Sequence, residues 1–445
     1  MFDSPLQKRL EAAHPLVFTL FAALAAFCSY ACMYAFRKPF TAAEFADGPV
    51  LFGLGYKSVL VITQVAGYAL SKFLGIKFVS EAKSDRRPLT ILSLIGISQL
   101  AWLGFGLAPP SYGFVFLFFN GLPLGMIWGL VFSYVEGRKF TEVIGLALCA
   151  SFVFSSGFVK DIGRMLMRAG LSEYWMPFMT GLVFLAPLLI SVWLLSQLPP
   201  PSAADEAART KRQPMNGAER WAFFRKFALG LVLLVTVYTV LTTYRDFRDN
   251  FMQDIWMEIV EAENPGLDAA ALVAAKDAVN FSATETPVSI GVLLLLMLLV
   301  LVKDNRMALM INLLAVLAGV LMAGISTWGF HQGWLSGFTW MMLTGFGTYL
   351  AYIPFNSILF DRLIAAFRYV SNVGFLIYLA DAFGYLGSVS ALIFKDFGAQ
   401  SMSWIEFFSA ISYALAAIGG LGTVMAMGYF WLRHQRRQAE LAAVS

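Results

Sequence analysis

The residues that could do chemistry gather in the stretch CMYAFRKPF (32–40), which ends a long, nearly uncharged run. Tyr30, Tyr34 and Arg37 are spaced i, i+4 and i+7, so on one helix they would share a face. Lys38 would point about 100° away. A guanidinium matches phosphate or carboxylate with two parallel hydrogen bonds, and a tyrosine hydroxyl can donate to an anion oxygen. The pattern predicts an anion-binding face.

Two other segments repeat this chemistry. In QVAGYALSKF, Gln64, Tyr68 and Lys72 lie on one helical stripe. In TTYRDFRDNF, Arg248 shares a face with Tyr244 and Arg245, and the neighbouring acids Asp246 and Asp249 are placed to pair with the cations. We expect these residues to extend the same site.

The alternative interpretation is that these cations lie at helix ends and reach lipid headgroups with their polar tips. An arginine at the bilayer centre costs roughly 2.5–3.5 kcal/mol, so it needs a partner or a water-filled cavity. Both arginines, Arg37 and Arg248, occur on tyrosine-bearing faces at equivalent places in the chain. Their helix ends also face the side that elsewhere avoids Lys and Arg, which favours ligand binding.

The elements that must position these residues are transmembrane helices. The chain has 445 residues, of which 59% are hydrophobic and 13% charged, and its mean hydropathy is +0.69. A spanning helix needs about 20 apolar residues, and many segments meet that. The composition indicates a multi-pass protein embedded in a lipid bilayer and excludes a soluble enzyme. The net charge of +4 is spread between helices, which argues against nucleic-acid binding.

We expect an all-α integral membrane fold with twelve spans in two six-helix, pseudo-symmetric halves. The N-terminal half is 1–197, the linker is 198–226 and the C-terminal half is 227–445, with an extracytoplasmic loop at 252–285 that forms a short surface helix. The predicted spans are 15–38, 57–76, 88–107, 112–135, 142–165, 175–197, 227–250, 286–302, 307–327, 337–359, 370–394 and 405–432.

The cations of the loops fix the orientation. They concentrate on one side, whereas the opposite loops LAPPSYG and WGFHQGWLSG have none. The positive-inside rule therefore places both termini and the linker in the cytoplasm, with the protein in a bacterial inner membrane. The cations of that side are Lys8, Arg9, Lys83, Arg86, Arg87, Arg138, Lys139, Arg209, Lys211, Arg212, Arg220, Arg225, Lys226, Lys303, Arg306, Arg362, Arg368, Arg433, Arg436 and Arg437.

Two short echoes indicate that the halves are duplicates. FRKPF (36–40) and FRDNF (247–251) lie at the same depth in the first span of each half, and FVKDIG (158–163) and IFKDFG (393–398) end the fifth spans. Transporters built from such repeats hold the substrate between them near the midplane. Arg37 and Arg248 would then face one ligand from the two halves.

The remaining charged residues suggest coupling and gating. Asp381 lies well inside an apolar span, where it is either a proton-coupling site or the partner of a cation on a neighbouring helix. The pairs Lys160–Asp161 and Lys395–Asp396 are expected to cap helices or to form ion pairs of an outer gate. We expect no metal and no cofactor, because Cys28 and Cys32 lack a third ligand and no phosphate loop is present.

With these residues in view, the chain resembles the organophosphate:phosphate antiporter branch of the major facilitator superfamily, which includes glycerol-3-phosphate and hexose-phosphate transporters. The resemblance lies in YACMYAFRKPF, in YALSKF (68–73) followed by SDR (84–86), in Gly125, Met126 and Trp128, and in FGYLGSVSA (383–391). It implies alternating access by two rocking halves, with Arg37 and Arg248 as the phosphate-binding pair. Lys38 and Lys72 would be auxiliary cations, and Tyr30 and Tyr34 would line the cavity.

Departures from that branch point to an altered pocket. Ser151 stands where the branch has a histidine, Arg248 has extra charged neighbours, and the loop after the seventh span is longer. The candidate substrate-binding residues are Arg37, Arg248, Lys38, Lys72, Tyr30, Tyr34, Tyr68, Tyr244, Arg245, Trp128 and Ser151. The candidate coupling or gating residues are Asp381, Asp249, Lys160, Asp161, Lys395 and Asp396.

The sequence thus predicts a monomeric secondary transporter of small organic anions, in particular an organophosphate or phosphonate exchanged for inorganic phosphate. One alternative is a proton-coupled carboxylate symporter that uses Asp381. Another is a non-transporting membrane sensor of phosphate esters. An enzyme is not expected, because no nucleophile and base can be assembled.

Overall fold

A computed structural model describes residues 4–81, 86–136, 138, 140–200, 217–367 and 373–444. Lys83, Lys139, Arg368, two residues of the SDR motif (Ser84 and Asp85) and residues 201–216 of the predicted linker lie outside these ranges. The described parts are helical, and their β-structure is limited to one isolated bridge between Leu51 and Leu54.

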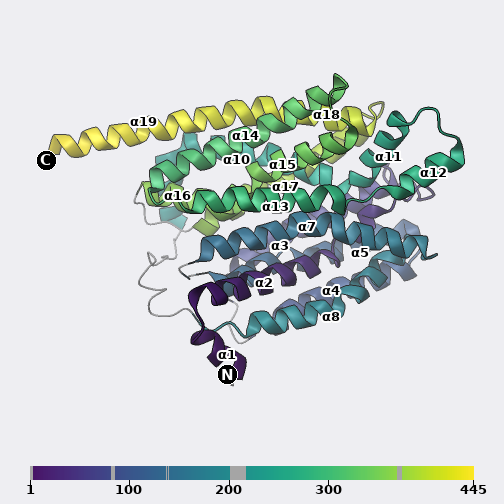
Figure 1. Cartoon of the computed structure of the whole chain (residues 1–445), viewed down its shortest axis with the longest axis horizontal. Helices are drawn as coiled ribbons and strands as arrows, with labels where there is room; N and C mark the ends of the chain where they lie inside the picture. The colour runs from purple at the N-terminus through teal and green to yellow at the C-terminus, as the bar shows by residue number, and fades with distance from the viewer. Residues whose placement is uncertain are drawn as a thin grey trace. The chain divides into compact units, whose positions relative to one another are not determined.

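The helices follow one another with short connections (Figure 1). Up to residue 200 they are α1 (Pro5–Glu11), α2 (Pro15–Tyr34), η1 (Pro39–Ala42), α3 (Tyr56–Glu81), α4 (Arg87–Leu107), η2 (Pro110–Tyr112), α5 (Gly113–Leu124), α6 (Ile127–Val135), α7 (Thr141–Arg168) and α8 (Met176–Ser196). After residue 216 they are α10 (Gly217–Asn250), α11 (Met252–Glu263), α12 (Ala269–Ala278), α13 (Ser282–Val300), α14 (Asn305–His331), α15 (Gly337–Ser357), α16 (Leu359–Ala366), α17 (Val373–Phe397), α18 (Trp404–Ala414), the π-helical η3 (Leu415–Gly419) and α19 (Gly420–Val444).

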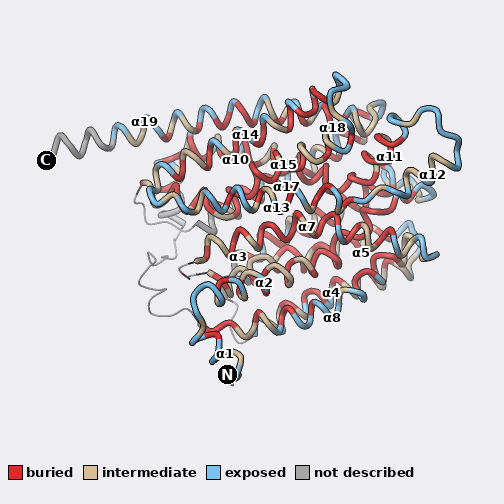
Figure 2. Tube along the Cα trace, in the orientation of Figure 1, coloured by how far each residue is buried: buried red, intermediate tan, exposed pale blue. Residues whose placement is uncertain are grey.

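Ten segments of the described chain are long and apolar enough to cross a membrane. The predicted spans 337–359 and 370–394 are not among these ten, but both are helical, as α15 and α17. The helical membrane architecture expected from the sequence is confirmed. Figure 2 shows the pattern typical of such helices, in which buried and exposed residues alternate along long helices such as α4, α8 and α14.

One boundary was predicted wrongly, and one predicted span contains a break that the sequence analysis did not foresee. The first span was expected to run to residue 38, but α2 ends at Tyr34, because Pro39 has no amide hydrogen to bond the Ala35 carbonyl and its ring would clash with that carbonyl in a continuing helix. The fourth span is divided into α5 and α6 at Gly125 and Met126, just after Pro123. The segment 252–285 holds two short helices, of which α12 has no buried residue and α11 buries one side.

The chain forms two compact units. Unit 1 comprises Met1–Thr210, Asp246–Leu293 and Val389–Phe408, and in it α3 packs on α5 while α2 packs on α7 and α8. Unit 2 comprises Lys211–Arg245, Leu294–Ser388 and Ser409–Ser445. There α14 packs on α15 so closely that a Cβ at Gly319 would lie 2.3 Å from the carbonyl oxygen of Gly347. The division of the chain into an N-terminal and a C-terminal six-helix half remains a prediction.

Candidate functional site

The turn after α2 places the predicted cations in a buried, non-helical segment of unit 1. The amides of Arg37 and Lys38 both donate to the carbonyl oxygen of Tyr34, which closes the helix, and η1 begins at Pro39. Only 2% of Arg37 and 1% of Lys38 is exposed. The i, i+4, i+7 face predicted through Arg37 is therefore wrong for Arg37 itself, because the helix stops three residues earlier.

A network of polar side chains supports this turn. The carbonyl oxygen of Phe36 accepts hydrogen bonds from Trp102 Nε1 at 2.7 Å and from Asn120 Nδ2 at 2.9 Å. Gln64 Nε2 donates to the Arg37 carbonyl at 2.8 Å and to Asn120 Oδ1 at 2.7 Å. Carbonyls at a helix end have no partner within the helix, and irregular backbone at membrane depth is tolerated only where protein groups satisfy it. The network thus fixes the backbone that carries both cations.

The first cluster of the site surrounds the ring of Tyr68. The guanidinium carbon of Arg37 lies 3.8 Å from the centroid of that ring, and Lys72 Nζ lies 5.4 Å from it. Lys72 Nζ is also 5.9 Å from the ring of Trp128. Two cations around one aromatic ring give a positive potential in a buried setting.

Tyrosines from α2 complete this cluster. The side chains of Tyr30 and Tyr68 are hydrogen-bonded, and the rings of Tyr30 and Tyr34 meet edge to face with their centroids 5.7 Å apart. The structure therefore brings together six of the predicted binding residues, all of them in unit 1. These are Tyr30, Tyr34, Arg37, Tyr68, Lys72 and Trp128.

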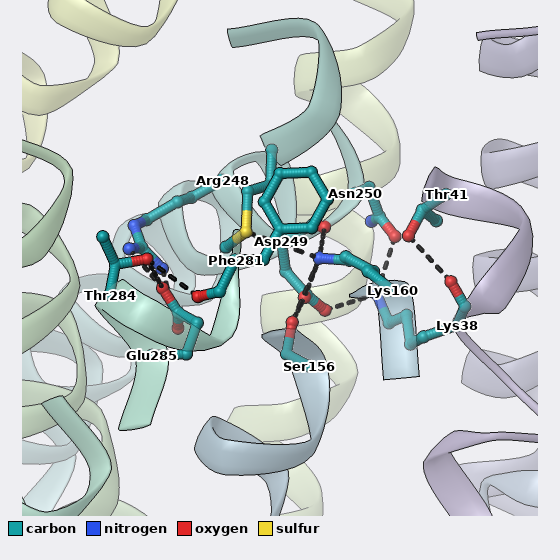
Figure 3. Close-up of polar contacts among 11 residues, drawn as sticks. Lys38, Thr41, Ser156, Lys160, Arg248, Asp249, Asn250, Phe281, Thr284 and Glu285 are labelled. Atoms are coloured by element: carbon teal, nitrogen blue, oxygen red, sulfur yellow. Dashed lines mark hydrogen bonds and ion pairs between the residues drawn. The ribbon is translucent and has the colours of Figure 1, made fainter. Parts of the chain in front are cut away.

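The second cluster is a carboxylate held by two lysines (Figure 3). Lys38 Nζ lies 2.5 Å from Asp249 Oδ2, and Lys160 Nζ lies 2.9 Å from Asp249 Oδ1. Lys38 also donates to Asn250 Oδ1 at 2.6 Å, and Ser156 donates to Asp249. Both lysines are fully buried. We call Lys38, Asp249 and Lys160 the lysine clamp.

Arg248 has a bidentate carboxylate partner that the sequence analysis missed. Its Nη2 lies 2.7 Å from Glu285 Oε1 and its Nη1 lies 3.2 Å from Oε2, with both side chains buried (Figure 3). Glu285 directly precedes the predicted eighth span, so an acid at the start of an apolar run was the available signal. A Cβ at Gly157 would lie 2.9 Å from the Phe281 carbonyl oxygen and 3.0 Å from Glu285, so glycine allows this approach.

Lys160 and Asp161, and likewise Lys395 and Asp396, are neighbours in the chain that form their hydrogen bonds with other residues. Asp161 accepts hydrogen bonds from the amides of Phe281 and Ser282 at 2.9 and 2.8 Å, and so it caps the start of α13 from α7. Lys395 donates to the Met402 carbonyl at 2.8 Å, and a hydrogen bond links Asp396 to Ser58 near the start of α3. Of the two predicted roles, Asp161 fulfils helix capping.

Asp381 lies in a separate hydrogen-bonded group inside unit 2. Tyr238 donates to Asp381 Oδ1 at 2.5 Å, its ring stacks on that of Tyr352, and their hydroxyl oxygens are 2.9 Å apart. The guanidinium carbon of Arg245 lies 4.4 Å from the centroid of the Tyr352 ring. In this group a buried acid accepts a hydrogen bond from Tyr238, and a buried cation lies over the ring of Tyr352.

Two other predicted binding residues, Tyr244 and Ser151, form hydrogen bonds of their own. The hydroxyl of Ser412 donates to the Tyr244 hydroxyl at 2.9 Å in unit 2, whereas the hydroxyl of Ser151 donates to the Leu148 carbonyl at 2.6 Å in unit 1. Within the described ranges, no group of three or more His, Cys, Asp or Glu side chains could hold a metal ion.

One further ion pair lies at the start of α3. Lys57 Nζ is 2.6 Å from Asp254 Oδ2, which joins the first turn of α3 to α11. Burial raises the pKa of Asp254, and the nearby Lys57 ammonium opposes that rise. Asp254 lies five residues after Asp249 of the lysine clamp in the chain.

Comparison with known proteins gives a family and a fold. The family of unknown function DUF5690 matches residues 39–433. No curated protein matches the sequence. Among solved structures, the nucleoside transporter NupG is similar with a TM-score of 0.57 and 12% identity over 93% of this chain and 98% of that one. The D-xylose-proton symporter is similar with a TM-score of 0.55 and 14% identity over 93% and 97% of the two chains. At such identity the likeness establishes the major facilitator fold and nothing finer.

Proposed function

The chain belongs to the family of unknown function DUF5690, and from that premise we propose that it is a secondary transporter of small organic anions. The fold supports transport, because the similar structures are a nucleoside transporter and a sugar symporter. Nucleosides and xylose carry no charge, so the fold does not account for buried cations. The single observation that carries the proposal is the pair Arg37 and Lys72 around the buried Tyr68 ring.

The substrate we propose is an organophosphate or a phosphonate, exchanged for inorganic phosphate. Arg37 offers a planar fork for two oxygens, and Lys72 adds a second charge at the same ring. Tyr30 and Tyr34 supply hydroxyls for the remaining oxygens. An anion bound there would offset the repulsion between the two cations, and the cations would offset the dehydration of the anion.

Arg248 does not fit the role of a second phosphate arginine, although the repeat predicted it. Its fork is occupied by the carboxylate of Glu285, which already matches the geometry that a phosphate would need. We assign Arg248 to the support of unit 1, because the Arg248–Glu285 pair joins the end of α10 to the start of α13.

The lysine clamp is proposed as a gate. Lys38 and Lys160 belong to the predicted N-terminal half of the chain and Asp249 to the predicted C-terminal half, so rocking of these two halves would have to break the contact. With both termini in the cytoplasm of a bacterial inner membrane, as the loop cations indicate, this gate would face the outside. Asp161, Asp396 and Lys395 would stabilise its closed form.

A specific observation favours one second candidate. Asp381 accepts a hydrogen bond from a buried tyrosine inside unit 2, and a carboxyl in such a place can exchange a proton with a driving gradient. The protein would then be a proton-coupled carboxylate symporter. Uptake that collapses when the proton gradient is dissipated, and that is insensitive to inorganic phosphate on the far side, would favour this candidate.

The proposal is tested by exchange in vesicles. Purified protein is reconstituted into liposomes loaded with inorganic phosphate, and uptake of radiolabelled phosphate is measured with glycerol phosphate, a phosphonate or succinate as competitor. We expect Arg37→Lys to lose most of the exchange, since an ammonium cannot reproduce the fork. The control Lys8→Gln removes a cation outside the spans and should exchange normally. Unaltered exchange by Arg37→Lys would refute the proposal.

A further inference from the structure

A cavity of about 370 Å³ lies in unit 1 beside the proposed gate. It is lined from the end of η1 and the loop after it, the end of α7, the loop before α8, α11 and α12. Each of the three clamp residues is followed four positions later in the chain by a residue of its wall. Ala42 follows Lys38, Arg164 follows Lys160, and Gln253 follows Asp249. Cavities of a few hundred Å³ hold small molecules.

The cations of the wall already have partners. Arg164 donates to the carbonyls of Val279 and Lys276 at 3.0 and 2.6 Å, and Arg168 donates to the Asp277 carbonyl. These are the carbonyls at the C-terminal end of α12, which a helix leaves unsatisfied and which favour cations. The ammonium of Lys276 pairs with Glu261. The basic side of the cavity is thus committed to holding α12.

Three acceptors of the wall, Gln253, Glu44 and Glu173, are not committed to holding α12. Gln253 is 5% exposed, and in the described part of the chain its Oε1 has no hydrogen-bond donor, while its Nε2 donates to Glu44 at 3.3 Å. Glu173 accepts from the Phe45 amide through Oε2 at 2.8 Å. Within the described ranges neither Glu44 nor Glu173 forms an ion pair. A buried acceptor without a donor is costly, so the wall calls for a ligand that donates hydrogen bonds.

We propose that this cavity binds a small organic ammonium compound, with the ammonium at Gln253, Glu44 and Glu173 and its carbon chain against Met167, Met257 and Val273. The apolar part of the wall, which includes these last three residues together with alanines of η1 and the loop after it, distinguishes this ligand from a bare inorganic cation. The described residues also lack a group of acids able to hold a metal. The site is separate from the anion site at Tyr68 and does not rest on the proposed transport function.

Ionisation of Glu173 should make the affinity for the ammonium ligand depend on pH. Burial raises the pKa of Glu173, the nearby carboxylates of Glu44 and Asp47 raise it further, and the Phe45 amide and Lys57 lower it. A bound ammonium opposes the two carboxylates and favours the ionised form of Glu173. Binding therefore releases protons, and the affinity should increase as the pH rises through the pKa of Glu173.

The inference is tested by calorimetric titration of the full-length protein in detergent with n-butylamine, and with 1-butanol as the neutral isostere. We expect the amine to bind and the alcohol not to bind. Glu44→Gln should weaken the amine about tenfold, the value of one lost charge-assisted hydrogen bond, and Gln253→Leu should weaken it further. Glu11→Gln, which removes an acid on α1, is the matched control and should bind as the wild type does.

Two results would overturn the inference. One is the absence of amine binding to the wild-type protein, and the other is equal binding by the wild type and a Gln253→Leu variant that is monodisperse and fully helical. Neither result bears on exchange of phosphate in vesicles, so failure here and failure of the transport proposal can be told apart.

Discussion

Replacement of Asp249 by asparagine removes the only carboxylate that the described residues place between Lys38 and Lys160. The change is nearly isosteric, so the new side chain keeps the shape of the old one and loses its charge. Two ammonium groups that are at most 1% exposed would then share one buried space without the carboxylate that contacts both of them. Breaking a buried ion pair in this way costs about 3–5 kcal/mol.

The expected shift in melting temperature follows from chain size. An unfolding entropy of about 2 cal/mol/K per residue gives roughly 1 °C per kcal/mol for a chain of this length. We therefore expect Asp249→Asn to melt about 3–5 °C lower than the wild type in detergent. Lys160→Met alone leaves one lysine with one carboxylate and should cost about 1 °C, because the remaining pair still balances.

A third variant separates charge from packing. Combining Asp249→Asn with Lys38→Met and Lys160→Met replaces the charges by apolar groups, and this should recover most of the lost stability. The assay is melting followed by intrinsic tryptophan fluorescence, with monodispersity checked by gel filtration. If Asp249→Asn melts within about 1 °C of the wild type, the lysine clamp does not hold unit 1 together and the reasoning fails.

Three other perturbations follow from the same contacts and can be measured by the same melting assay. Gly157→Ala should lower the melting temperature by about 1–3 °C, because its Cβ would lie 2.9 Å from a carbonyl oxygen across the helix contact; an unchanged melt would contradict this close approach of the two segments. Trp102→Phe should cost about 0.5–1.5 kcal/mol, because the Phe36 carbonyl loses one of its buried donors and keeps Asn120, and the control Trp221→Phe at an exposed site should be neutral. Glu173→Gln should be more stable than the wild type at pH 7 and equal to it near pH 4, because burial raises the pKa of Glu173 above its ordinary 4.5. The stability contributed by the protonated form is complete below that ordinary value and is lost as the pH rises through the folded-state pKa; a difference that grows toward acid would contradict this sign.

The sequence predicted the membrane architecture because hydropathy is set locally, and runs of apolar residues are visible without knowledge of packing. An earlier end for the first helix was also available, since Pro39 lacks the amide hydrogen that a continuing helix needs. Reading the apolar run through to Lys38 gave that proline too little weight. Tyr68 and Lys72 were expected on one stripe because they recur at helical spacing, whereas Arg37 reaches the same ring from the turn after α2, which that spacing did not indicate.

Pairing between distant segments was harder to foresee. Glu285 lies 37 residues from Arg248, and no local rule connects an acid at the start of one helix to an arginine near the end of another. Asp161 and Lys160 are neighbours in the chain but leave α7 in different directions, toward α13 and Asp249. Their partners depend on how the helices pack, which the pattern of residues along one helix does not specify.

The central claim is that Arg37 and Lys72 form an anion site, and anion-dependent stabilisation of the purified protein tests it most directly. The melting temperature is measured with increasing glycerol phosphate and, separately, with glycerol at matched ionic strength. We predict that the phosphate ester raises the melting temperature of the wild type by mass action, that glycerol does not, and that Arg37→Gln abolishes the rise. An equal response to ester and glycerol, or an undiminished response in Arg37→Gln, would contradict the account.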